Sequence, residues 1–179
     1  MTTPTGVQHE EKVYWRPWSD GAFDEARRQD KLLLLDIGAV WCHWCHVMDE
    51  TTYEDDRVAA LLNENFIPVR VDRDARPDLD RRYQSAPTLV ESHGGGWPLT
   101  VFLLSDGTPL YRATYLPPED VGGHMGLLTL AREMLDIWTG RRDEVTAAAG
   151  KIRRHVEALR GPDLQGDVTE ARLDELFRR

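Results

Sequence analysis

Apolar residues form short, nearly uninterrupted runs at several points along the chain. Residues 32–38 contain a single charged residue, and residues 66–72 and 99–104 are similarly rich in leucine, valine, isoleucine and phenylalanine. Runs of this length without polar alternation are typical of buried strands. The Ser-Asp-Gly-Thr sequence at 105–108 is a turn signal, so we expect 99–104 to form an antiparallel hairpin with 109–114 at one edge of a sheet.

Between and after these runs, apolar residues recur at steps of three and four, which indicates helices. Helical residues between 32–38 and 66–72 would make these two strands parallel, because the chain must cross over before it starts the second strand. The order of elements therefore predicts an α/β fold with a central mixed sheet flanked by helices. We expect helices over 22–28, from the cysteine pair at 42–45 to an interruption near 51–53, and over 55–64, 77–92, 126–138, 143–159 and 169–177.

The length of 179 residues, 41% of them hydrophobic, is sufficient for one domain with a substantial core. Residues 1–12 are polar, and we expect a flexible N-terminus there. Residues 13–160 would form the domain, and residues 161–179 a C-terminal helical extension or connector.

The formal net charge of −9 makes the surface acidic, and no cluster of Lys and Arg stands out, so no nucleic-acid partner is expected. No apolar run approaches the roughly 20 residues of a membrane-spanning helix, so no membrane association is expected. The first residues lack the basic start and apolar stretch of a signal peptide. We therefore expect a cytoplasmic protein, in which a cysteine pair is more often catalytic or metal-binding than structural.

The two cysteines of the chain, Cys42 and Cys45, follow the first apolar strand directly and precede a helical pattern. A strand that leads into C-x-x-C at the start of a helix is the arrangement of thioredoxin-type redox proteins. The free N–H groups and the dipole at a helix N-terminus favour a thiolate over a thiol. We expect Cys42 to be the exposed nucleophile with a low pKa, and Cys45 to be the buried thiol that resolves the mixed disulfide.

Two longer motifs contain the cysteines and a glycine-rich segment downstream of them, at 42–48 (CHWCHVM) and 95–103 (GGWPLTVFL). Over about residues 15–120 the sequence resembles the thioredoxin-like domain of the spermatogenesis-associated thioredoxin-like family. The resemblance implies a thioredoxin fold in which Pro98 is a cis-proline that faces the cysteines. Members of the family usually continue into a large helical-barrel domain, so such a domain is an expected partner.

Two positions depart from the family pattern. Asp36 stands where the family usually has a small residue, and Trp41 where it has Thr or Ala. Both residues are similar to ordinary thioredoxins, in which a buried aspartate at this position helps to move the proton of the resolving cysteine. The lysine that accompanies that aspartate in thioredoxins aligns with Pro68. We therefore expect Asp36 to be buried without a cationic partner and to have a raised pKa.

Together these observations predict a thiol-disulfide oxidoreductase that acts on protein or small-molecule disulfides and is recharged by a reductase or a thiol donor. No metal or other cofactor is expected. The expected catalytic residues are Cys42, Cys45 and Asp36. The expected substrate-binding residues are Trp41, His43, Trp44, Trp97 and Pro98.

Two other classes of function fit the same residues. A zinc or iron–sulfur site would use Cys42, Cys45 and His46 with His43 or His93, but a second C-x-x-C is missing. The sequence C-x-x-C-H also matches a haem-attachment motif, but the expected start of a helix at the cysteines leaves no room for a haem. A binding module would use the tryptophans and glycines as a groove without redox turnover. The alternating Asp and Arg residues of 73–82 are interpreted as a solvated, salt-bridged surface.

Overall fold

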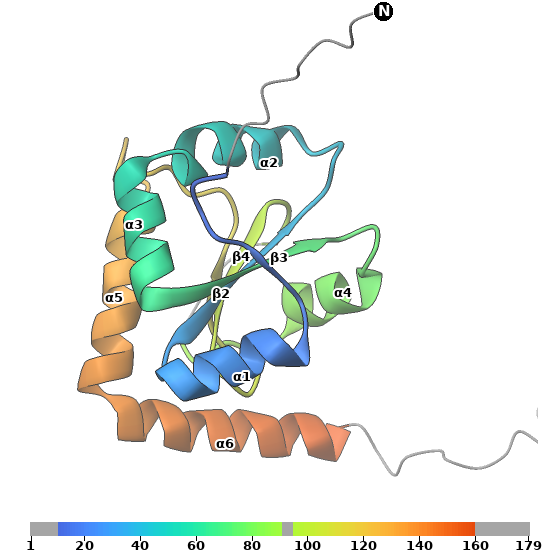
Figure 1. The fold of residues 1–179 in the computed structure, drawn as a ribbon. Helices are drawn as coiled ribbons and strands as arrows, with labels where there is room; N and C mark the ends of the chain where they lie inside the picture. Colours follow the sequence, from blue (N-terminus) through green and yellow to red (C-terminus); the bar gives the residue numbers. More distant parts are fainter. Residues whose placement is uncertain (1–10, 91–94, 160–179) are drawn as a thin grey trace, which may run out of the picture.

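The computed structural model describes residues 11–90 and 95–159. Five strands form one mixed sheet in the order β1-β3-β2-β4-β5, with β2 at its centre (Figure 1). Strands β1, β3 and β2 are parallel to one another, β4 is antiparallel to β2, and β4 and β5 form an antiparallel hairpin at one edge. The predicted mixed sheet and hairpin are therefore confirmed. The strands are β1 (Arg16–Pro17), β2 (Leu32–Gly38), β3 (Phe66–Asp72), β4 (Leu99–Leu103) and β5 (Pro109–Ala113).

The helices also follow the predicted pattern, with two differences. The interruption expected near 51–53 is a π-helical segment, η1, that continues α2 without a break. The fourth helix ends at Ser85 rather than near 92, because Ala86 precedes Pro87 and is extended. The helices are α1 (Asp20–Gln29), α2 (His43–Met48), η1 (Asp49–Tyr53), α3 (Asp56–Asn65), α4 (Pro77–Ser85), α5 (Leu127–Gly140) and α6 (Arg142–Leu159). The helix expected at 169–177 lies outside the described residues.

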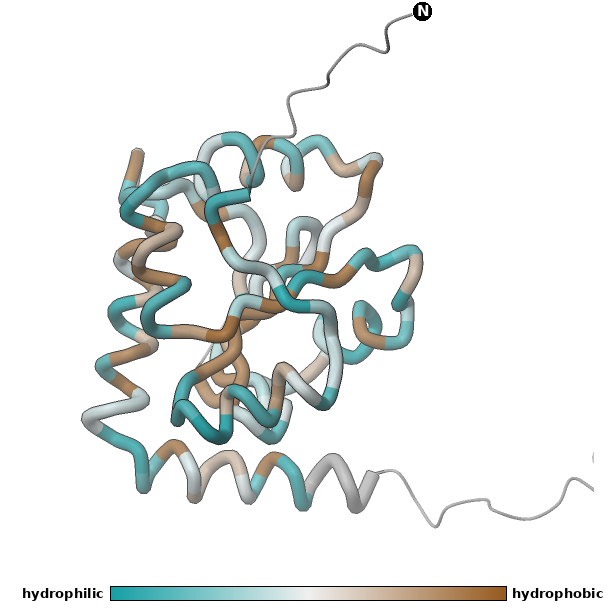
Figure 2. Tube along the Cα trace, in the orientation of Figure 1, coloured by the Kyte–Doolittle hydropathy of each residue, from teal (hydrophilic) through white to brown (hydrophobic). Residues whose placement is uncertain are grey.

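Successive side chains of β2 point to opposite faces of the sheet, and each face has its own core. Leu32 and Leu34 pack with residues of α3 and α5, whereas Leu33 and Leu35 pack with residues of α1 and α4. The most hydrophobic part of the chain accordingly lies along the central strands (Figure 2). Asp36 lies on the face of Leu32 and Leu34, where it is the one charged residue of β2.

Helix α3 begins with a well-defined cap. The side chain of Asp55 accepts hydrogen bonds from the backbone N–H groups of Arg57, at 2.8 Å, and Val58, at 3.3 Å. The hydrogen bond from the Arg57 side chain and these two N–H groups lower the pKa of Asp55 to about 2.

We expect Asp55→Ala to lower the free energy of unfolding at neutral pH by about 0.5–2 kcal/mol, because two N–H groups lose their acceptor. Asp55→Asn retains the cap without the charge and should be close to wild type at acidic pH. The lowered pKa means that the charge stabilises the fold above about pH 4 and that this contribution disappears as the pH falls through about 2. Urea unfolding at several pH values measures the difference, and a wild-type advantage over Asp55→Asn that persists at pH 2 would contradict it.

Candidate functional site

The cysteine pair lies where the chain leaves the central strand β2 and enters α2. Cys42 is the N-cap residue of α2, and its Sγ accepts a hydrogen bond from the backbone N–H of Cys45 at 3.2 Å. The two residues are joined by a disulfide, with their Cα atoms 5.3 Å apart. Their exposed fractions are 7% and 8%, so the expected greater exposure of Cys42 is not found in this disulfide-bonded state.

The second motif of the sequence comes to lie beside the disulfide. The peptide bond between Trp97 and Pro98 is cis and leads directly into β4. Trp97 is partly buried and packs against the small cluster of Ala39, Cys42 and Cys45. Residues far apart in the sequence therefore meet at the same end of the sheet.

Trp97 is one of several aromatic and charged side chains that lie on the β3 side of the disulfide. Its ring lies edge-on to that of Trp41 with the ring centroids 5.7 Å apart, and the guanidinium of Arg73 lies 4.5 Å from the Trp97 centroid. Both indole N–H groups are bound by carboxylates: Trp41 donates to Asp74 at 2.8 Å and Trp97 donates to Asp80 at 2.9 Å. The orientations of both tryptophans are therefore fixed, although Trp41 remains 57% exposed.

Helix α4 supplies further contacts that hold the segment before Pro98. The side-chain amide of Gln84 donates to the backbone carbonyl of Gly96 at 3.1 Å and accepts from its N–H at 3.2 Å. Asp80, one turn earlier on the helix, is buried. The interpretation of 73–82 as a solvated surface is therefore wrong for Asp80. Asp80 and Gln84 were not identified from the sequence as residues that support the site. The signal that could have found them is their position directly after the apolar residues Leu79 and Tyr83.

The opposite flank of the disulfide is aromatic too. Trp44, in the first turn of α2, is 52% exposed, and its ring centroid lies 4.9 Å from that of Tyr115 in the segment after β5. His43 is exposed, and its ring lies 5.7 Å from that of Trp44. Exposed tryptophans thus flank the cysteines on both sides of β2, with Trp41 towards β3 and Trp44 towards β5.

Below the cysteines, β2 contributes a buried carboxylate. Asp36 is 5% exposed and lies directly beside Arg70 of the parallel strand β3. The Nε atom of Arg70 is 3.2 Å from Oδ2 of Asp36. The expectation that Asp36 lacks a cationic partner is therefore wrong. Pro68 lies beside Leu34, so the residue two positions later on the same face supplies the cation.

The expected direction of the pKa shift is nevertheless found. Burial raises the pKa of Asp36 to about 6, although Arg70 opposes the shift, and the negative charge of Asp49 adds to it. Oδ1 of Asp36 has no well-formed hydrogen bond among the described residues, although the neighbouring Tyr53 hydroxyl lies close enough to lower the pKa of Asp36 as Arg70 does. Burial and the charge of Asp36 also raise the pKa of the neighbouring Tyr53 hydroxyl well above its usual value. Asp36 can therefore change its protonation state near neutral pH.

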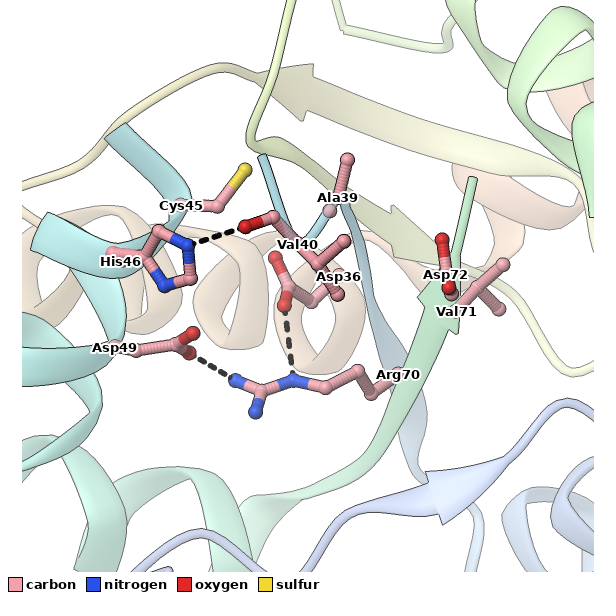
Figure 3. A pocket seen from close by; sticks show the side chains of 10 residues that line it. Asp36, Ala39, Val40, Cys45, His46, Asp49, Arg70, Val71 and Asp72 are labelled. Carbon is pink, nitrogen blue, oxygen red and sulfur yellow. Dashed lines mark hydrogen bonds and ion pairs between the residues drawn. The ribbon is translucent and has the colours of Figure 1, made fainter. Parts of the chain in front are cut away.

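A cavity of about 180 Å³ connects this carboxylate with the second cysteine. Its volume is sufficient for a few water molecules at about 30 Å³ each. Figure 3 shows Asp36 facing the helix that carries Cys45 and His46. Nε2 of His46 lies 2.7 Å from the carbonyl oxygen of Val40. The lining residues are Asp36, Gly38, Ala39, Val40, Cys45, His46, Asp49, Arg70, Val71 and Asp72.

Within 11–90 and 95–159, no three His, Cys, Asp or Glu residues are grouped closely enough to hold a metal ion. His93, considered as a metal ligand above, lies outside these ranges. No helix in the same part of the chain is long and apolar enough to cross a membrane.

Comparisons with solved structures agree with the fold. A thioredoxin from Thermus thermophilus matches with a TM-score of 0.55 at 20% sequence identity, covering 70% of this chain and 89% of the other. A structure described as DsbH Oxidoreductase matches with a TM-score of 0.51 at 16% identity, covering 76% of this chain and 93% of the other. The chain therefore has a thioredoxin-like fold.

Sequence comparisons identify closer relatives. Spermatogenesis-associated protein 20 of Rattus norvegicus is 40% identical over 151 residues, which are 84% of this chain and 19% of the rat protein. Uncharacterized protein B0495.5 of Caenorhabditis elegans is 34% identical over 98% of this chain and 24% of its own length. The chain thus spans a quarter or less of these relatives. The family profile described as "Thioredox_DsbH: Protein of unknown function, DUF255" matches residues 5–157, and the chain belongs to this family.

Proposed function

We propose that the protein is a thiol-disulfide oxidoreductase in which Cys42 is the nucleophile and Cys45 the resolving thiol. The observation that supports this best is the cysteine pair at the start of α2, set beside Trp97–Pro98 and above a cavity that contains a buried carboxylate. Cys42, as the N-cap residue, is the cysteine nearest to the free N–H groups of the helix. These groups stabilise a thiolate at Cys42 in the reduced protein.

The reaction transfers two electrons from the cysteine pair to a substrate disulfide. The Cys42 thiolate attacks one substrate sulfur, the substrate S–S bond breaks, and the second substrate sulfur leaves as a thiolate. Cys45 then loses its proton and attacks Sγ of Cys42, which releases the first substrate sulfur as a thiolate. The protein is left with the Cys42–Cys45 disulfide, and a reductase or thiol donor of the cytoplasm must reduce it again.

Asp36 takes the proton of Cys45 in this scheme. Its pKa of about 6 makes it mostly ionised at neutral pH yet basic enough to hold a proton during the resolving step. The cavity between the two residues allows the transfer to pass through water.

Protein disulfides are the substrates that the surface around the cysteines favours. Trp41, Trp44 and Trp97 offer apolar contact area, and Pro98 and His43 lie in the same region. The large exposed fractions of Trp41 and Trp44 leave their rings available to a partner.

A non-catalytic binding module of a larger protein is the second candidate. This chain covers a quarter or less of the length of its relatives, and this observation favours the binding role. In a longer protein, a further domain such as a helical barrel would be the partner of the module. Loss of redox function on cysteine substitution distinguishes the two candidates.

Cys45→Ser should trap mixed disulfides through Cys42, because attack can occur but resolution cannot. Cys42→Ser should trap none. Incubation of each variant with an oxidised model protein, followed by non-reducing electrophoresis and mass spectrometry, identifies the linked cysteine. Trapping through Cys45 in the Cys42→Ser variant would reverse the assigned roles, and the absence of trapping and of disulfide reduction in any form would favour the binding module.

Asp36→Asn should slow the resolving step by roughly 100-fold while leaving the first attack nearly unchanged, because only the second step needs a base. In the wild type, the resolving rate should rise with pH through a midpoint near 6 as Asp36 ionises, and this rise should be absent in the variant. Stopped-flow measurement of the two steps at pH 5–8 tests both expectations. Equal slowing of both steps would instead indicate general damage to the site.

Trp44→Ala should raise the KM for protein disulfides several-fold and leave the reaction with a small aromatic disulfide reagent nearly unchanged, because only a protein covers the flank of the site. Tyr14→Ala is the matched control. Tyr14 is another exposed aromatic residue, at 68% against 52% for Trp44, and its backbone N–H donates to Asn63 of α3 rather than contacting the cysteine region. Equal KM changes in the two variants would show that Trp44 does not contact the substrate.

A further inference from the structure

A single guanidinium joins several carboxylates below the cysteines. Nη2 of Arg70 is 2.6 Å from Oδ1 of Asp49, Nη1 is 2.8 Å from Oε1 of Glu11, and Nε is 3.2 Å from Oδ2 of Asp36. The guanidinium carbon also lies 4.1 Å from the centroid of the Trp15 ring. The shortest of the three ion pairs is therefore the one with Asp49, and the longest is the one with Asp36. Figure 3 shows Arg70 between these two carboxylates.

This division of contacts leaves Asp36 incompletely paired. An arginine that faced Asp36 alone could donate two parallel hydrogen bonds and occupy both carboxylate oxygens. Here Arg70 reaches Asp36 through one nitrogen, and Oδ1 is left without a well-formed hydrogen bond among the described residues. Stacking on Trp15 and the ion pair with Asp49 keep the guanidinium in this orientation.

Asp49 is also tied to the helix that carries the cysteines. Its backbone N–H donates to the carbonyl of Cys45, one turn earlier. The ion pair between Asp49 and Arg70 therefore connects the helix of the proton donor, Cys45, with the strand next to the proton acceptor, Asp36. Asp36, Cys45, Asp49 and Arg70 all line the same cavity.

The other groups around Asp36 come from each neighbouring element. Strand β3 contributes Arg70 and Asp72, and α2 contributes Cys45 and His46 to the cavity. The π-helical segment contributes Asp49 and Tyr53, and β4 places Thr100 directly beside Asp36. Of these groups, Arg70 and the Tyr53 hydroxyl lower the pKa of Asp36, and Asp49 raises it.

We propose that Asp49 is a positioning residue, which shares the guanidinium of Arg70 with Asp36 and so leaves one oxygen of Asp36 unpaired with Arg70 and able to take the proton of Cys45. The assignment rests on the proposed oxidoreductase function. Without the charge of Asp49, Arg70 turns its terminal nitrogen to Asp36, both oxygens become paired, and Asp36 becomes a weaker base.

The test compares Asp49→Asn with Glu50→Gln in the reduced protein. Both substitutions remove one negative charge from adjacent positions and keep the size of the side chain, but Glu50 is exposed and is not among the ion-pair partners found for Arg70 in the described residues. Carboxyl carbon NMR gives the titration midpoint of Asp36 without any need for activity. Stopped-flow kinetics gives the pH profile of the resolving step, and Asp49→Glu tests rescue by a conserved charge.

For Asp49→Asn, the Asp36 midpoint should move from about pH 6 to lower pH by at least about half a pH unit. The resolving rate above pH 7 should fall at least threefold, while the rate of the first attack stays the same. Glu50→Gln should change neither quantity, and Asp49→Glu should restore both towards the wild-type values.

The possible outcomes separate this inference from the function on which it rests. If the wild type reduces disulfides but Asp49→Asn leaves the Asp36 titration and the resolving profile unchanged, the role of Asp49 is overturned. The same holds if Glu50→Gln produces an equal shift. If the wild type neither reduces nor forms any disulfide, the proposed function fails, whatever the NMR titration shows.

Discussion

The ion pair between Asp36 and Arg70 joins the two parallel central strands directly below the cysteines. A charged carboxylate in an apolar sheet is costly unless a cation and hydrogen bonds compensate for the lost water. Arg70 compensates only in part, because it also binds Asp49 and Glu11. The pKa of Asp36 therefore stays at about 6, above that of a fully paired carboxylate. Asp36 can gain and lose a proton near neutral pH, as the proposed proton transfer requires.

A second set of contacts holds the Trp97–Pro98 segment beside the cysteines. It shares no residue with the ion pairs around Asp36. Helix α4 holds Gly96 through Gln84 and the Trp97 indole through Asp80, and Arg73 lies against the tryptophan rings. Two strands of the sheet thus bring the cysteines and the Trp97–Pro98 segment together, and one helix fixes the orientation of that segment. None of the α4 residues that hold this segment lines the cavity around Asp36.

Much of the fold could be predicted because its signals are local. The apolar runs at 32–38 and 66–72 are long enough to be buried strands, and a hairpin turn separates 99–104 from 109–114. The boundary of α4 was the main error, since the helical pattern continues past Ala86 whereas Pro87 restricts the backbone before it. The C-x-x-C motif indicates the candidate site for a similar reason, because the proposed chemistry depends on a spacing of three residues within one helical turn.

The sequence by itself determined the order of elements from α1 to α6, the cysteine pair and the burial of Asp36 within an apolar strand, but it did not indicate the two-residue edge strand β1. Only the tertiary structure decided which cation meets Asp36, because the register between β2 and β3 places Arg70 rather than Pro68 beside it. It also decided that Asp80 and Gln84 support Trp97 and Gly96, whereas Arg76 and Asp78 form an exposed ion pair on the same segment. Residues with the same charge pattern differ in this way because side-chain pairing depends on strand register and helix orientation, which are fixed by packing over the whole domain.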